Sequence, residues 1–211
     1  METCCPGEVF TDTISPAHAP LRIGDGLRHN GRRDLSSTCT GTLHTRGGDT
    51  WLNFSRKRYI PAVDETVVGV VIEVHAENYK VDICAPSRAS LPVLSFAGAT
   101  KHNRPKLVVG SLVHARVLKT NSATDPLLTC IEDSEQSRGL GVLSGGVVHH
   151  FNTEQAHKLL CRRGSDALGA LGEIFSFEVI VGLNGRIWVA ASSVEDAFLI
   201  AKVFAVDVVK C

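Results

Sequence analysis

The middle of the chain alternates hydrophobic and polar residues with the period of two that is typical of β-strands. The first two alternating segments are separated by Glu77 and Asn78, which favour a tight hairpin turn. No pattern of helix length interrupts the series. Five short strands in succession predict a small closed barrel of the oligonucleotide-binding kind over residues 62–135. The five segments are residues 66–74, 79–83, 90–94, 111–119 and 126–131.

Beyond residue 135 the pattern becomes partly helical. The first helical segment places Ala156, Leu159 and Leu160 on one face, and Thr153 suits its N-terminal cap. A separate α+β domain is therefore predicted over residues 136–211. Its elements are a helix at 153–163, strands at 173–181 and 186–191, and a helix at 193–206. The last helix groups four apolar residues on one face: Ala197, Ile200, Ala201 and Phe204.

The N-terminal part of the chain has no long regular pattern. Residues 1–20 contain three prolines and no apolar period, so we expect a disordered or loosely attached leader. Glycines interrupt residues 21–61 every few positions, and the pieces between them favour short strands joined by turns. The chain is therefore predicted to be multidomain and mostly β, with a small N-terminal β domain, a five-stranded barrel and an α+β domain.

The composition is that of an ordinary globular protein. Of the 211 residues 44% are hydrophobic and 21% are charged, which is enough apolar chain to bury a sizeable core. The 22 basic and 22 acidic residues give no net charge, which excludes a polybasic tail and an acidic disordered chain. The apolar runs are far shorter than the roughly 20 residues of a membrane helix, so no membrane partner is expected.

The cysteines and the first residues indicate a reducing compartment. The chain has seven cysteines, an odd number without a C-x-x-C pair, and this spacing matches neither a disulfide framework nor a zinc ribbon. The first residues lack the basic and apolar segments of a secretory signal. We therefore expect reduced thiols in the cytosol or nucleus.

One cluster of metal-binding residue types precedes and enters the first predicted helix. His149, His150, His157 and Cys161 lie within 13 residues, and the last two share a helical face. No carboxylate has a matching spacing, and no glycine-rich elbow precedes a serine or cysteine. A partly buried cysteine with solvated histidines is therefore the favoured interpretation, and a metal or Cys/His site is the minor one.

Two acidic pairs could in principle hold a two-metal nuclease site. Glu132 and Asp133 lie at a module junction, and Glu195 and Asp196 lie at a helix N-terminus, where carboxylates are common for electrostatic reasons alone. The chain also lacks the glycine-rich loops that hold nucleotide phosphates. The sequence therefore predicts a protein that is not an enzyme and that needs no metal or cofactor.

Positive charge is concentrated locally although the chain is neutral. Between residues 88 and 119 there are six basic residues, two histidines and no acidic residue, which indicates a phosphate-bearing partner such as RNA. A second stretch at residues 22–58 has eight basic and three acidic residues. The six basic residues of the first stretch are Arg88, Lys101, Arg104, Lys106, Arg116 and Lys119.

A barrel of this class binds single-stranded nucleic acid across its second and third strands and the adjoining loops. On that face Tyr79 could stack on a base, while Lys101 and Arg104 could hold phosphates. The alternative is that the Tyr79 ring belongs to the core and that the charges form a solvated face. We include Tyr79, Arg88, Lys106 and Arg116 with the two loop residues as candidates for RNA contact.

Residues Gly182, Leu183, Asn184 and Gly185 match the G-x-x-G pattern with which some KH domains clamp RNA. That clamp lies between two helices, whereas these residues lie between two predicted strands. Asn-Gly is a favoured pair for hairpin turns that need positive φ. A structural turn is therefore the favoured interpretation, with Gly182, Asn184 and Gly185 as its key residues.

Several motifs together resemble one known family. In this order they are LRIGDGLR at 21–28, KRYIP at 57–61, VGVV at 68–71, LSFAGATKHNRP at 94–105 and GLNGRIWV at 182–189. The pattern is similar to that of the eukaryotic RNA exosome cap subunit that has an N-terminal β domain, an S1 barrel and a KH domain. The resemblance extends over residues 21–206.

This resemblance implies a non-catalytic, RNA-binding subunit with an S1 domain and a KH-like domain. Such a subunit sits with other cap subunits on a ring of RNase PH-like proteins and guides single-stranded RNA 3′ ends, including those of rRNA, toward a nuclease elsewhere in the complex. The resemblance also implies nuclear and nucleolar as well as cytoplasmic localisation. It places the Gly182–Gly185 motif at the boundary of the S1 and KH domains.

Lys101, His102, Asn103 and Arg104 occupy the family's loop motif, and the resemblance implies that they contact RNA or a neighbouring subunit. An alternative function stays open, namely a free-standing S1-type RNA-binding factor in translation or ribosome biogenesis. The two hypotheses make different predictions for the basic segment 22–58. A cap subunit would use this surface to dock on protein, whereas a free-standing RNA-binding factor would not need it for docking.

Overall fold

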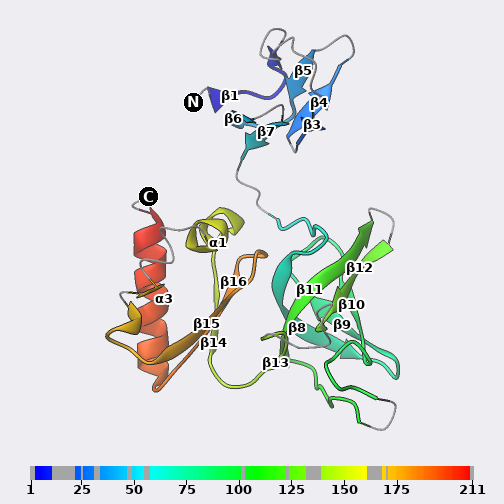
Figure 1. The fold of residues 1–211 in the computed structure, drawn as a ribbon, viewed down its shortest axis with the longest axis vertical. Helices are drawn as coiled ribbons and strands as arrows, with labels where there is room; N and C mark the ends of the chain where they lie inside the picture. The colour runs from blue at the N-terminus through cyan, green and yellow to red at the C-terminus, as the bar shows by residue number, and fades with distance from the viewer. Residues whose placement is uncertain are drawn as a thin grey trace. The chain divides into compact units, whose positions relative to one another are not determined.

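The computed structural model (Figure 1) divides the chain into two compact units, Met1–Ser55 and Arg56–Cys211. Each unit is described by itself. The structure describes residues 3–10, 22–24, 26–30, 34–46, 49–54, 58–100, 103–121, 124–131, 139–160, 168–169 and 171–209.

The first unit contains two small sheets. The four-stranded sheet has the order β1-β6-β7-β3, and the three-stranded sheet has the order β2-β5-β4. Leu35 and Leu52 are buried in this unit, and the β6–β7 hairpin pairs His44 with Trp51, whose rings stack. The strands are β1 Thr3–Cys4, β2 Val9–Phe10, β3 Arg22–Ile23, β4 Leu27–His29, β5 Leu35–Ser37, β6 Gly41–Arg46 and β7 Asp49–Asn53.

The prediction of a disordered or loosely attached leader is wrong for residues 3–10, which contain β1 and β2. β1 pairs with β6 through Thr3 opposite Thr42, β2 pairs with β5, and Cys4 is buried. The partner strands lie far along the chain and bond through the backbone, so a local pattern does not reveal them. Residues 11–21 lie outside the described part of the chain.

The second unit begins with the predicted five-stranded barrel. Its six-stranded sheet has the order β12-β10-β9-β8-β11-β13; an additional pairing of β12 with β11 closes five of the strands into the barrel, and β13 is a sixth strand paired with β11. The fold class is thereby confirmed. Gly69 lies where β8 comes so close to the next strand that a Cβ would collide with Val81. The strands are β8 Thr66–Val74, β9 Asn78–Asp82, β10 Ala89–Pro92, β11 Leu112–Asn121, β12 Thr124–Thr129 and β13 Gly141–Leu143.

The barrel core extends beyond the strands to the segment that precedes them. The ring of Tyr59 is buried among the apolar core residues, and its hydroxyl donates a hydrogen bond to the Glu65 carboxylate at 2.5 Å. Burial and this carboxylate raise the pKa of Tyr59 well above its ordinary value. Asp64 adopts a positive φ of 69° there, and its backbone N–H donates to the carbonyl of Val117 at 2.9 Å. Residues 59–65 therefore belong structurally to the barrel.

The C-terminal module of this unit is a three-stranded sheet with helices packed on one face. The sheet has the order β14-β16-β15, and α3 lies along it (Figure 1). Its buried cluster includes Leu159 of α1, Ile187 and Val189 of β16, and the predicted face of α3, whose four apolar side chains are confirmed as buried. The elements are β14 Val147–His150, α1 Thr153–Leu160, β15 Phe177–Val181, β16 Arg186–Ala191 and α3 Val194–Val209.

Three details of this module differ from the sequence prediction. Asn152 caps α1 in place of Thr153: its carbonyl accepts from Ala156 N at 3.0 Å, and its own N–H donates to Gln155 Oε1 at 2.9 Å. β15 begins at Phe177 and not at residue 173 as predicted. The Glu173 N–H instead donates to the Gly169 carbonyl at 3.3 Å, which is the hydrogen bond of a helical turn. β14 was not predicted, since its sequence follows a glycine-rich stretch. Among the described residues no helix has the length and apolar character that crossing a membrane requires.

Candidate nucleic-acid interface

The residues Gly182–Gly185 form the turn that joins β15 to β16. Gly185 N donates to the Gly182 carbonyl at 3.0 Å, and Gly185 has a φ of 80°, which favours glycine. The Leu183 N–H donates to the Thr66 carbonyl of β8 at 2.9 Å. The turn therefore lies against the barrel wall.

Asn184 holds this turn to the barrel through a buried side-chain amide. Its Nδ2 donates to the carbonyls of Val68 at 2.8 Å and Ile83 at 3.1 Å, and its Oδ1 accepts from Val68 N at 3.3 Å. The residue is 4% exposed. A Cβ on Gly182 would lie only 2.7 Å from Val68 N. The turn has no space for a nucleotide backbone, which speaks against the RNA-clamp interpretation.

A second polar contact joins the same two modules. The buried Arg186 guanidinium donates from Nη1 to the Asp82 carbonyl and from Nη2 to its carboxylate, both at 2.5 Å. Burial alone would raise the pKa of Asp82, but the hydrogen bonds from Arg186 and the Cys84 N–H, with the charges of Arg186 and His150, bring it below its ordinary value. Sequence analysis missed this pair: Arg186 lies in the GLNGRIWV motif, but nothing in the sequence links it to Asp82, which lies 104 residues earlier.

The loop between β10 and β11 carries most of the candidate RNA-binding residues. Lys101 and His102 lie outside the described residues. Thr100 and Asn103, the described residues on either side, are joined by two hydrogen bonds, from Thr100 N to the Asn103 carbonyl at 2.8 Å and from Asn103 N to Thr100 Oγ1 at 3.0 Å. Asn103, Arg104 and Lys106 are exposed, so these three side chains can meet a ligand from solvent.

The structure corrects the proposed stacking role of Tyr79. The residue is 4% exposed, its ring meets Phe96 edge to face at 6.4 Å between centroids, and its hydroxyl donates to the Pro105 carbonyl at 2.6 Å. Neither face of the ring is open to a base. Trp188 is likewise buried, and its Nε1 donates to the Gly145 carbonyl at 2.9 Å.

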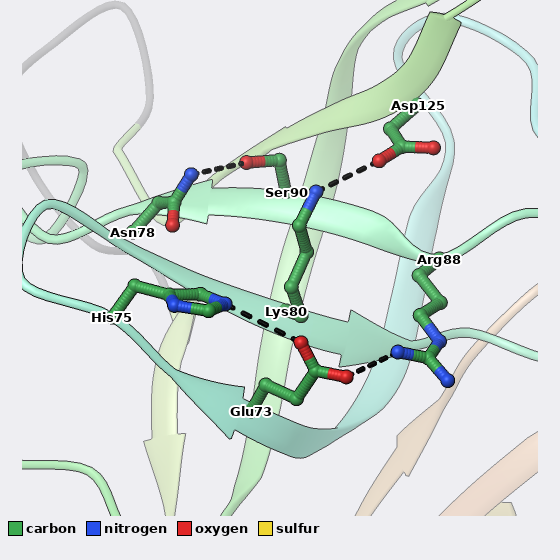
Figure 2. Close-up of polar contacts among 7 residues, drawn as sticks. All are labelled: Glu73, His75, Asn78, Lys80, Arg88, Ser90 and Asp125. Carbon is green, nitrogen blue, oxygen red and sulfur yellow. Dashed lines mark hydrogen bonds and ion pairs between the residues drawn. The ribbon is translucent and has the colours of Figure 1, made fainter.

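The basic stretch between residues 88 and 119 is partly neutralised by acidic residues from other segments. Arg88 pairs with Glu73 of β8, which also contacts His75 at 3.3 Å (Figure 2). Arg116 lies 3.5 Å from Asp64. The net charge around this stretch in the folded protein is therefore lower than the sum of its charges along the sequence.

The outward face of the barrel strands shown in Figure 2 is polar and internally paired. Lys80 of β9 reaches over β10 to Asp125 of β12 at 2.8 Å, and Asn78 donates to Ser90 at 3.3 Å. In contrast, no ion pair involves Arg104 or Lys106 within the described part of the chain. The loop therefore offers positive charge that the strand face does not.

Those candidate metal and catalytic residues that the structure describes are not gathered into a site. His149 and His150 are consecutive on β14 and so point to opposite faces of the sheet, and the His149 ring packs against Phe198 at 5.1 Å. Burial, with the neighbouring charge of His150, lowers the pKa of His149. Cys161, Glu132 and Asp133 lie outside the described residues. Within the described ranges, no three His, Cys, Asp or Glu residues are arranged to hold a metal ion.

Comparison with known families gives two matches that agree with this architecture. Residues 59–141 match the model of the S1 domain of exosome complex component RRP40, and residues 146–195 match a KH domain. The first match begins at Tyr59, where the barrel core begins.

Individual relatives are similar over most of the chain. Exosome complex component RRP40 of Mus musculus is 33% identical over 89% of this chain and 71% of its own length. The corresponding protein of Schizosaccharomyces pombe is 35% identical over 92% of this chain and 83% of its own length. The crystal structure of a candidate exosome complex RNA-binding protein superposes with a TM-score of 0.57 at 27% identity, over 70% of this chain and 86% of that one.

Replacing Asn184 with alanine should lower the free energy of unfolding by about 2–4 kcal/mol, because buried backbone groups of Val68 and Ile83 would lose their partner. Urea unfolding monitored by circular dichroism measures this change in the free energy of unfolding. Asn78→Ala is the control, since that side chain makes a single contact on the outer face, and it should cost less than about 0.5 kcal/mol. Equal effects of the two substitutions would contradict the role of Asn184.

The contact between Asp82 and Arg186 should make stability depend on acid pH. A carboxyl group with a lowered folded-state pKa stabilises the fold above its unfolded pKa of about 3.9, and this contribution is lost as the pH falls through the folded-state pKa. The stability difference between the natural protein and Asp82→Asn should therefore be largest near neutral pH and shrink below about pH 4. Urea unfolding over a pH series measures it, and a difference that does not change with pH would refute the prediction.

Proposed function

The chain belongs to the family of exosome complex component RRP40, and on that premise we propose that it acts as an RNA-binding subunit of an exosome complex. The observation that carries the proposal is the joined pair of an S1 barrel and a KH-type module, matched in sequence over residues 59–141 and 146–195. Both modules belong to folds that bind nucleic acid in many proteins. Family membership makes the complex the natural setting.

The proposed role within that complex is guidance of RNA and not its hydrolysis. The subunit would sit with other cap subunits on a ring of RNase PH-like proteins and direct single-stranded 3′ ends, including those of rRNA precursors, toward a nuclease elsewhere. The proposed location is the nucleus and nucleolus, and also the cytoplasm.

The loop at residues 98–106 is the proposed RNA contact. Arg104 and Lys106 are exposed there, while Arg88 and Arg116 lie beside acidic residues and Tyr79 is buried. Contact with RNA would therefore be made mainly to phosphates, from a loop at the end of the barrel. The strand face of Figure 2 does not support base stacking. Its labelled side chains are polar, and the one aromatic ring among them, the His75 imidazole, contacts Glu73.

Affinity purification of the tagged protein from its own cells at moderate salt tests the assignment to the complex. Mass spectrometry of the eluate should identify RNase PH-like ring proteins in stable association. Recovery of the protein alone, or with ribosomes, would refute the cap-subunit role and favour a free-standing S1-type RNA-binding factor. An RNase assay on the same eluate determines whether nuclease activity accompanies the partners.

Replacing Lys101 and Arg104 together with glutamate should weaken RNA retention by the assembled complex. Each lost phosphate contact reduces the slope of log K against log salt by about 0.7 on single-stranded RNA, so the slope should fall by roughly 1–1.5. Lys202→Glu, an exposed charge reversal on α3, is the control and should leave the slope unchanged. An unchanged slope in the double variant would refute the role of the loop.

A further inference from the structure

We infer that Tyr79 is a positioning residue for the RNA-binding loop, acting through its hydroxyl group. The inference rests on the proposed function, because it assigns the loop at residues 98–106 to RNA. It concerns a residue that does not touch RNA itself, since its side chain is buried in the barrel.

The hydroxyl of Tyr79 connects the barrel core directly to the returning limb of the loop. It donates to the Pro105 carbonyl at 2.6 Å, next to the exposed Arg104 and one residue before the exposed Lys106. The ring is fixed by the apolar core and by its edge contact with Phe96, which lies where the loop departs. One side chain thus holds the backbone beside both described cationic residues of the loop.

Other contacts bind the loop to the same end of the barrel. Arg104 Nη1 donates to the Ala76 carbonyl at 3.0 Å, in the turn between β8 and β9, and two hydrogen bonds join Thr100 to Asn103. Tyr79 is the buried member of this set, and its hydrogen bond is partly buried, whereas the side-chain hydrogen bonds of Arg104 and Thr100 are exposed. An ordered loop loses less conformational freedom when it binds, which increases affinity without any new contact to the ligand.

The same barrel core contains a second buried tyrosine whose hydroxyl bonds outside the loop. Tyr59 is also buried, and its hydroxyl donates to Glu65 in the segment before β8. Replacing either tyrosine with phenylalanine removes one buried hydroxyl and leaves the ring in place. A general loss of core stability would appear in both variants, whereas a loss of loop order would appear only in Tyr79→Phe.

The test compares full-length natural protein, Tyr79→Phe, Tyr59→Phe and the Lys101→Glu/Arg104→Glu double variant. Hydrogen exchange of the free protein, read by mass spectrometry, reports loop order without RNA. Titration with a fluorescent oligouridylate over a salt series reports affinity and salt slope. In Tyr79→Phe we expect faster exchange in residues 98–106 and affinity weaker by roughly threefold to tenfold, with the natural salt slope, because the phosphate-binding charges are still present.

The outcomes separate this inference from the proposed function. If the double variant lowers the salt slope but Tyr79→Phe binds and exchanges like the natural protein, the positioning role is overturned and the RNA role of the loop stands. If Tyr59→Phe changes loop exchange and affinity as much as Tyr79→Phe, the effect is one of core stability and the inference is also overturned. If the double variant binds with unchanged slope, the RNA role of the loop fails, and the positioning role fails with it.

Discussion

The buried amide of Asn184 is the interaction on which the arrangement of the barrel and the C-terminal module depends. A primary amide removed from water is strongly destabilising unless it is hydrogen-bonded, and this one finds its partners only where Val68 and Ile83 present their backbone groups to the turn. Arg186 imposes a second directional requirement through Asp82. Since sliding either module would leave buried polar groups unpaired, the contacts favour a single relative placement.

That placement determines which surfaces are left for RNA. It buries the G-x-N-G turn against β8, so the C-terminal module does not present those residues as a clamp. The large rings of Tyr79 and Trp188 are buried as well, which removes them as stacking platforms. The barrel still offers an outward strand face with paired polar side chains and a loop with exposed cations. Recognition of RNA at the proposed loop contact would be electrostatic and would depend little on base identity.

Local patterns predicted the barrel and the short strands of residues 21–61, but they missed β1 and β2. Alternation is a property of each strand alone, so the barrel strands and the buried face of α3 could be found from sequence. β1 is only two residues long and is held by backbone pairing to Gly41 and Thr42, which has no sequence signature. The buried state of Tyr79 did have a signal: it shares the inward side of β9 with Val81, so its parity along the strand indicated the core.

The charge distribution shows why the summed charge of a sequence segment differs from the net charge around that segment in the folded protein. Residues 88–119 contain no acidic residue, yet a sheet brings neighbouring strands within side-chain reach, and Glu73 and Asp64 come from segments before that stretch. Strand cations are therefore readily matched by acids on adjacent segments. A loop at the end of a barrel has few such neighbours, and Arg104 uses a backbone carbonyl in place of a carboxylate. A protein of zero net charge can thus present positive charge at one loop, while cations on or beside the strands, such as Lys80, Arg88 and Arg116, lie close to acidic residues.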